Sequence, residues 1–165
     1  MVADTFEIKP ATIQDVPLIL AFIKELAEYE KLSHEVVATE AALSDSLFSQ
    51  PSSVEVIIGY VNNQPVSFAL FFQSYSTFLA RTGIYLEDLF VRPAARGKGV
   101  GKKMLAYLAH LAKKRKCGRL EWSVLDWNES AIGFYKKLGA KMMDEWTVFR
   151  LTNEALNKLA ATHQE

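Results

Sequence analysis

The sequence predicts an α/β or α+β sandwich in which helices pack on a mixed β-sheet. Two amphipathic helical stretches lie near the start, a β-rich hairpin follows, and the second half alternates strands with helices. The chain has 165 residues, of which 50% are hydrophobic and 23% charged, a composition typical of a globular protein with a real core. Because the sequence contains no internal repeat, low-complexity tract or evident linker, we expect residues 1–165 to form a single domain.

The elements of the first half follow from capping, apolar periodicity and turn chemistry. Thr12, with Asp15 three residues later, is expected to cap the first helix. The segment Asn62–Pro65 is typical of a hairpin connection between two β-rich runs. In chain order, the expected elements are a strand at Phe6–Ile8, a helix from Thr12, a helix at Thr39–Phe48, and strands at Val54–Val61 and Val66–Gln73.

The second half alternates apolar strands with amphipathic helices. Gly118 and Gly139 are placed to end two of the helices, since glycine readily adopts the left-handed conformation found after helix ends. In chain order, the expected elements are a strand at Ile84–Val91, a helix at Lys98–Lys116, a strand at Arg119–Leu125, a helix at Glu129–Leu138, strands at Lys141–Met143 and Trp146–Leu151, and a short helix from Asn153.

Charge and cysteine content narrow the classes of function. The 19 basic residues balance the 19 acidic ones, which argues against nucleic acid or an anionic membrane as the main partner. The basic run Lys113–Lys116 falls where a helix should end and there complements the helix dipole. With Cys117 as its only cysteine, the chain cannot form an internal disulfide, and no signal peptide or membrane span is evident. We therefore expect a cytoplasmic protein.

The most informative segment is a glycine-rich turn between a strand and a helix. Glycines let the backbone bend tightly and approach a ligand, and the first turn of the helix presents unpaired amide N–H groups. Phosphate is the natural partner of such a turn, and three cations add charge beside it. The candidate phosphate-binding residues are Arg96, Gly97, Lys98, Gly99, Val100, Gly101 and Lys102.

Two familiar phosphate loops do not fit this turn. A nucleotide-triphosphatase loop needs Ser or Thr after its lysine, where this chain has Lys103. The dinucleotide fingerprint has one more residue between its second and third glycines and lies at the first strand of its domain. A simple tight turn would explain the glycines but not the three cations, so we favour a phosphate ligand of another kind.

Two carboxylates interrupt an otherwise apolar strand. Strand alternation is expected to send Glu87 to one face and Asp88 to the other. An unpaired buried carboxylate costs several kcal/mol, so these acids need partners or a water-filled cleft. The strand either passes near solvent, or at least one acid lines a site for a cationic substrate.

These motifs together resemble a known family. Arg96–Gly101 is similar to the R/Q-x-x-G-x-G/A coenzyme A signature of the GNAT superfamily of N-acetyltransferases. The segments Tyr85–Asp88, Trp127–Ser130 and Phe134–Ala140, with Trp146, resemble its diamine acetyltransferase branch, which includes spermidine/spermine and thialysine N-ε-acetyltransferases. The similarity extends over nearly the whole chain, from Ile8 to about Leu151.

The resemblance implies a fold and a cosubstrate. The family fold is a mixed, mostly antiparallel central sheet with helices on both faces and a V-shaped splay between its fourth and fifth strands. Acetyl-CoA lies in the splay, with its pyrophosphate on the glycine turn and its pantetheine paired like an extra strand. The resemblance adds as cofactor-contacting residues Leu89, Phe90, Val91, Asn128, Ser130 and Tyr135.

The resemblance also implies catalytic and substrate-binding residues. Tyr135 matches the family's catalytic tyrosine, and Glu87 matches the carboxylate proposed as base. The positions that shape the amine site in the family correspond to Tyr29, Glu30, Glu87, Asp88, Asp144 and Trp146. The family uses no metal, and its members are commonly homodimers, so we expect no metal site and a homodimer.

The expected reaction is transfer of acetyl from acetyl-CoA to the primary amine of a thialysine-like amino acid, a polyamine or another small molecule. Tyr75–Phe78 stands where polyamine enzymes carry an acid and a tryptophan, which favours the thialysine type. Protein lysine or N-terminal acetylation is an alternative with the same chemistry. A non-catalytic acyl-CoA sensor, or a nucleic-acid-binding role resting on Lys113–Lys116, are alternatives from other classes.

Overall fold

The computed structural model describes residues 4–49 and 52–163, which divide after Leu125 into two compact units. The single domain expected for residues 1–165 stays a prediction. The strands of the first unit are β1 (Phe6–Pro10), β2 (Val54–Val61), β3 (Gln64–Ser76), β4 (Arg81–Val91) and β5 (Leu120–Trp122). Its helices are α1 (Val16–Tyr29), α2 (Glu40–Phe48) and α3 (Val100–Lys114), with short 3-10 turns at Ile13–Asp15, Ser33–Glu35 and Pro93–Ala95.

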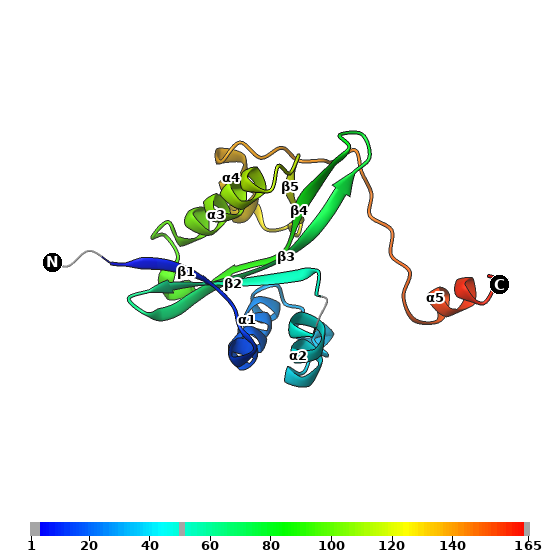
Figure 1. The fold of residues 1–165 in the computed structure, drawn as a ribbon, viewed down its shortest axis with the longest axis horizontal. Coiled ribbons are helices and arrows are strands. Elements are labelled where there is room, and N and C mark those ends of the chain that lie inside the picture. Colours follow the sequence, from blue (N-terminus) through cyan, green and yellow to red (C-terminus); the bar gives the residue numbers. More distant parts are fainter. Residues whose placement is uncertain (1–3, 50–51, 164–165) are drawn as a thin grey trace. The chain divides into compact units, whose positions relative to one another are not determined.

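The five strands form one sheet in the order β1-β2-β3-β4-β5 (Figure 1). The first four are antiparallel to their neighbours, and β5 is parallel to β4. Helices α1 and α2 cover one face of this sheet and α3 covers the other. The predicted class is therefore confirmed: a mixed, mostly antiparallel sheet with helices on both faces.

Local sequence signals start and stop these elements much as expected. Thr12 and Asp15 form a reciprocal capping box, in which the Thr12 amide donates to the Asp15 carboxylate at 2.8 Å. Thr39 caps α2 by accepting a bond from the Ala42 amide at 3.2 Å. Asn62 and Asn63 both adopt positive φ, as a two-residue hairpin turn requires, so β2 and β3 meet in a tight turn.

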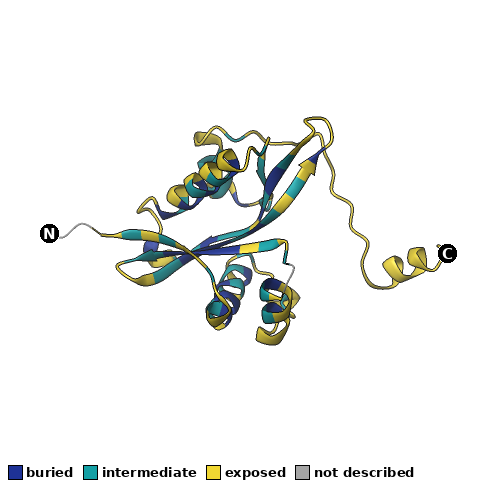
Figure 2. Ribbon diagram, viewed as in Figure 1, coloured by how far each residue is buried: buried dark blue, intermediate teal, exposed yellow. Residues whose placement is uncertain are grey.

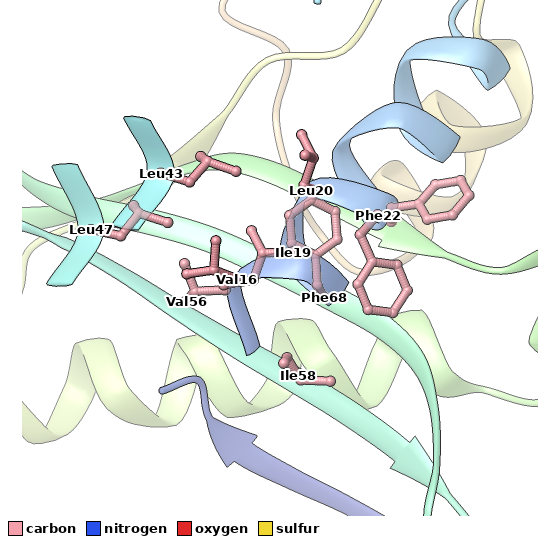
Figure 3. Close-up of a cluster of buried hydrophobic side chains, with 10 residues drawn as sticks. Val16, Ile19, Leu20, Phe22, Leu43, Leu47, Val56, Ile58 and Phe68 are labelled. Atoms are coloured by element: carbon pink, nitrogen blue, oxygen red, sulfur yellow. The ribbon is translucent and has the colours of Figure 1, made fainter. Parts of the chain in front are cut away.

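The main core lies between the sheet and the first two helices. Figure 3 shows side chains from α1, α2, β2 and β3 converging there. Phe22 of α1 stacks on Phe68 of β3 with ring centroids 5.2 Å apart, and Phe90 of β4 meets Phe22 edge-on. On the other face of the sheet, Met104 and Leu108 of α3 are fully buried. Buried stretches (dark blue) occur in the helices and in the central strands (Figure 2).

A bulge interrupts β4 at its acidic pair. Leu70 of β3 is opposite Asp88, whereas the next residue, Phe71, is opposite Leu86, so Glu87 is the extra residue. Strict alternation would place Leu86 and Asp88 on one face of the sheet. Pairing with consecutive residues of β3 places them on opposite faces instead, and Asp88 shares the α1 face with Phe90. Regular alternation is therefore interrupted at Glu87, and the placement of Glu87 and Asp88 on opposite faces stays a prediction.

The predicted splay appears as a short β4–β5 contact. β5 pairs with β4 only from Ile84 to Leu86, although β4 continues to Val91. β5 is also shorter than the expected Arg119–Leu125, and α3 ends at Lys114. Lys116, with a φ of 57°, takes the left-handed conformation that was expected of Gly118. The last residues of β4 therefore have no strand partner on the β5 side within the described part of the first unit.

The second unit contains α4 (Glu129–Lys137) and α5 (Asn153–Ala160). The two strands expected at Lys141–Met143 and Trp146–Leu151 are wrong, because neither segment forms strand in the structure. β-rich composition becomes strand only where another strand supplies hydrogen-bond partners, and none is described in this unit. Residues 141–160, here termed the carboxyl-terminal segment, are exposed throughout (Figure 2).

Candidate acetyl-CoA and amine site

The glycine-rich turn has the predicted conformation. Gly97 and Gly99 have φ values of 76° and 78°, in the left-handed region that side chains disfavour. A Cβ added at either position would meet nothing within 4 Å, so the backbone here faces open space. Gly99 is the N-cap of α3 and offers no capping side chain. The turn therefore leaves the beginning of α3 accessible to a ligand.

The first amides of α3 are available to an anion. The Lys103 amide donates to the Gly99 carbonyl at 3.0 Å, which closes the first helical turn. The amides before it have no intrahelical acceptor and lie at the positive end of the helix dipole. Lys98 and Lys102 are exposed, and neither takes part in the ion pairs found among the described residues. This combination suits a phosphate or pyrophosphate group.

The end of β4 offers an open hydrogen-bonding edge. The Arg92 amide donates to the Val66 carbonyl at 2.8 Å, so the backbone of Arg92 faces β3. Because antiparallel pairs alternate, the N–H and C=O groups of Val91 and Leu89 point away from β3. β5 has already ended on that side. An extended amide-containing chain, such as pantetheine, can therefore pair there as an added strand.

Three carboxylates belong to the same part of the first unit. Burial raises the pKa of Asp88 to about 6, with smaller contributions from the charges of Glu87 and Glu30. Burial also raises the pKa of Glu30, which follows the last residue of α1. None of the three takes part in an ion pair among the described residues. A partly buried carboxylate without a cationic partner is stabilised when a cationic substrate binds beside it.

Arg96 does not point freely into solvent, as a simple phosphate ligand would. Its Nε donates to the Val91 carbonyl oxygen at 2.8 Å. Its guanidinium carbon lies 4.4 Å from the centroid of the Tyr29 ring and 5.4 Å from that of Phe90. The side chain thus connects the glycine turn with the end of α1.

The remaining predicted site residues belong to the second unit. Asn128 is buried and caps α4, with its side-chain oxygen accepting from the Ala131 amide at 3.2 Å. Tyr135 is half-buried, its ring 5.4 Å from that of Phe134, and Ser130 is exposed in the first turn of α4. Asp144 lies in a turn of the carboxyl-terminal segment, and Trp146 follows it with 74% of its surface exposed.

The structure thus brings together the predicted residues of the first unit: the glycine turn, the β4 edge, the three acids and Tyr29. The other predicted site residues belong to the second unit: Asn128, Ser130, Tyr135, Asp144 and Trp146. The sequence did not predict the bulge at Glu87 or the packing of the Arg96 guanidinium on the Tyr29 ring. Two adjacent acids in an apolar strand were a signal for the bulge, whereas nothing in the sequence indicated the stacked arginine.

Neither a metal-binding group nor a membrane-spanning helix is found in the described parts of the chain. These parts contain no group of three or more His, Cys, Asp and Glu side chains arranged to hold a metal ion. No helix in the described ranges has the length and apolar character needed to cross a membrane.

Comparison with known proteins identifies the family. Residues 21–140 match the acetyltransferase (GNAT) family. The thialysine N-ε-acetyltransferase of Bos taurus is 38% identical over 93% of this chain and 96% of its own length. An L-ornithine N5-acetyltransferase of Arabidopsis thaliana is 34% identical over 92% of this chain and 86% of its own.

A solved structure agrees with the sequence relatives. An integron cassette protein from the mobile metagenome of V. cholerae superimposes with a TM-score of 0.79 and 32% identity, covering 95% of this chain and 98% of that one. The glycine turn and the open β4 edge fit the acetyl-CoA that acetyltransferases of this family use as cosubstrate. The chain belongs to the acetyltransferase (GNAT) family and is an acetyl-CoA-dependent N-acetyltransferase.

Proposed function

We propose that this enzyme acetylates the primary amine of a small molecule, with an amino acid of the thialysine or ornithine kind preferred over a polyamine. The observation that carries the proposal is the group of three carboxylates, Glu30, Glu87 and Asp88, which have no cationic partner among the described ion pairs. Such a group attracts an ammonium ion and releases its desolvation cost when one binds. The names of the two sequence relatives support the same class of amine.

The amine must lose a proton before it attacks the thioester. A primary amine with a pKa of ~10.4 is neutral in roughly one molecule in 2,500 at pH 7, a deficit of about 4.6 kcal/mol. A carboxylate is in general too weak a base to hold that proton directly. In the proposal Glu87 accepts it through an ordered water, while Asp88 and Glu30 position the substrate ammonium.

The sulfur of coenzyme A leaves as a thiolate and needs a proton donor. The proposal assigns this role to Tyr135, because the residue matches the family's catalytic tyrosine. A phenol with a pKa of ~10 gives a proton to a thiolate near ~8.5 at a cost of about 2 kcal/mol. A hydrogen bond from the phenol to the sulfur still accelerates the reaction, since it strengthens as charge develops. In this proposal Asn128 and Ser130 contact the cosubstrate, and Asp144 and Trp146 shape the amine site.

The choice between an amino acid and a polyamine depends on the number of acids along the site. A long polycation needs carboxylates spaced along its length. At Tyr75–Phe78, where polyamine enzymes carry an acid, this chain has Ser76, whose hydroxyl accepts a 2.6 Å bond from Arg119. Arg119 also pairs with Glu121 at 3.4 Å, so the nearby carboxylate already has a cationic partner and attracts a second ammonium group less. The proposal therefore favours a substrate with a single reacting amine and an α-amino-acid end.

The test is a thiol-release assay with acetyl-CoA and a panel of amines. The proposal predicts release of free coenzyme A with thialysine or ornithine at a higher kcat/KM than with spermidine, spermine or putrescine. Faster release with spermine would reverse the preference. Faster release with lysine-containing peptides would support the protein acetyltransferase instead. Cosubstrate binding without release for any amine would support a non-catalytic sensor.

The enzyme is further proposed to act as a homodimer. The carboxyl-terminal segment exposes Trp146, Val148 and Phe149, with Phe149 exposed over 92% of its surface. Exposed aromatic and branched side chains in one short segment are typical of a protein contact, because water penalises such a surface. The expected β-rich run Trp146–Leu151 becomes strand when a second chain supplies a sheet edge.

A further inference from the structure

The position of the Arg96 side chain has a consequence for cosubstrate binding. Its Nε–H donates at 2.8 Å to the carbonyl oxygen of Val91. Its planar guanidinium lies 4.4 Å from the ring centroid of Tyr29 and 5.4 Å from that of Phe90. One bond and two ring contacts hold this exposed cation against the wall formed by α1 and β4.

The carbonyl that Arg96 occupies is the last one on the open edge of β4. The alternation of the β3–β4 ladder turns the Val91 carbonyl away from β3, and β5 pairs only as far as Leu86. An added strand would place an amide N–H about 2.9 Å from this same oxygen. The Arg96 Nε already lies 2.8 Å from this oxygen. The guanidinium N–H and the amide N–H of an added strand therefore compete for the same acceptor.

We propose that Arg96 is a latch that closes the open edge of β4 in the cosubstrate-free enzyme and is displaced when the pantetheine arm pairs there. The inference rests on the proposed acetyl-CoA site and adds a conformational step to it. Arg96 directly precedes Gly97, the first of the candidate phosphate-binding glycines. Once the pantetheine arm has displaced it, the guanidinium has an anionic phosphate within reach as a new partner.

Release of the latch also changes the amine side of the site. Tyr29 is one of the predicted amine-site residues, and Arg96 covers its ring in the described conformation. The positive guanidinium over this ring also disfavours an approaching ammonium ion. Displacement by the cosubstrate removes both obstacles, so amine binding becomes stronger after acetyl-CoA has bound.

The latch can be observed directly by NMR of arginine Nε–H groups in the full-length protein. The Arg96 signal is identified by its loss in Arg96→Lys. We expect this signal to be ring-shifted and slowly exchanging in the free protein, and to move when coenzyme A is added. Adenosine 3′,5′-bisphosphate, which lacks the pantetheine arm, should leave it in place.

The two proposals fail in different ways in this experiment. If coenzyme A shifts neither the Gly97 and Gly99 amides nor Arg96, the acetyl-CoA site itself is wrong. If it shifts the glycine amides and leaves the Arg96 Nε–H unchanged, the site stands and the latch is refuted. The latch is refuted as well if adenosine 3′,5′-bisphosphate displaces Arg96 as fully as coenzyme A does.

A second measurement uses Tyr29 and leaves Arg96 in place for the phosphates. Tyr29→Leu removes the ring under the guanidinium, whereas Tyr29→Phe retains it. The neutral fragment S-acetylpantetheine competes only with the latch, so its affinity should rise about two- to five-fold in Tyr29→Leu, as expected for loss of one exposed cation–π contact. Tyr29→Phe should match the unaltered protein. Equal affinity in all three proteins would show that the Arg96 contacts are merely structural.

Discussion

At the scale of the residue, Asp88 is a partly buried carboxylate that forms no ion pair among the described residues. Its folded pKa of about 6 lies above the ordinary value of 3.8, so the folded state binds a proton more tightly than the unfolded chain does. Stability therefore falls as the pH rises from about 4 to about 6. Above about pH 6 the free energy of unfolding stays lowered by the full cost of burying the charged carboxylate.

Asp88→Asn should consequently stabilise the free enzyme at pH 8, and only about a third as much at pH 4.5. The shift of about two pKa units corresponds to at most about 3 kcal/mol, or a rise of the melting temperature by at most roughly 6–12 °C. Thermal melts at the two pH values measure this difference, with Glu28→Gln at an exposed position of α1 as the control. A lower melting temperature for Asp88→Asn at pH 8 would contradict the account of a carboxylate kept for a substrate cation.

Tyr135 gives the second prediction at this scale. Tyr135→Phe keeps the ring contact with Phe134 and removes the hydroxyl that would donate to the departing sulfur. Turnover should fall by roughly a hundred-fold or more, as loss of an acid–base group usually causes, while acetyl-CoA affinity changes little. Steady-state kinetics and calorimetry measure the two quantities. Tyr75→Phe, at an exposed position, is the control, and equal turnover in both variants would remove Tyr135 from the mechanism.

At the scale of the element, the glycine turn depends on backbone conformation. Gly99→Ala forces a side chain into a φ of 78° and should destabilise the protein by about 1–2 kcal/mol, with a loss of acetyl-CoA affinity because the first amides of α3 move. Gly133→Ala is the matched control within α4, since a Cβ there meets nothing within 4 Å and its backbone is ordinary. Chemical denaturation and calorimetry distinguish the two. Unchanged cosubstrate binding by a folded Gly99→Ala protein would exclude the turn from the site.

The same scale shows where sequence reasoning succeeds and where it does not. Capping at Thr12 and Thr39 and the Asn62–Asn63 turn are local chemistry, so their elements were predicted within a few residues. The bulge at Glu87 is a property of pairing between β3 and β4, so the two adjacent acids hint at it but do not fix its register. The stacked Arg96 likewise depends on α1 lying over β4, which only the tertiary structure determines.

At the scale of the whole molecule, the carboxyl-terminal segment is where prediction and structure differ most. Trp146–Leu151 has the composition of a strand, yet the structure leaves it unpaired and exposed. Strand formation is decided by a partner, and the sequence of one chain does not contain that partner's position. The proposed homodimer supplies a partner and accounts for the exposed aromatic residues.

The dimer can be tested with one apolar side chain. Phe149→Glu should shift the molar mass measured by light scattering from two chains toward one, because a carboxylate opposes burial in an apolar contact. Arg150→Glu, at the neighbouring exposed position, alters charge without removing an apolar group and should remain dimeric. A single-chain mass for the unaltered protein at all concentrations would refute the proposed dimer.

The most direct test of the whole account is calorimetric titration of the purified protein with acetyl-CoA. We predict saturable binding of one acetyl-CoA per chain, weakened by Gly99→Ala and unaffected by Gly133→Ala. No detectable binding of acetyl-CoA or coenzyme A would contradict the account at its root, because every proposed role depends on the cosubstrate lying on the glycine turn and along β4.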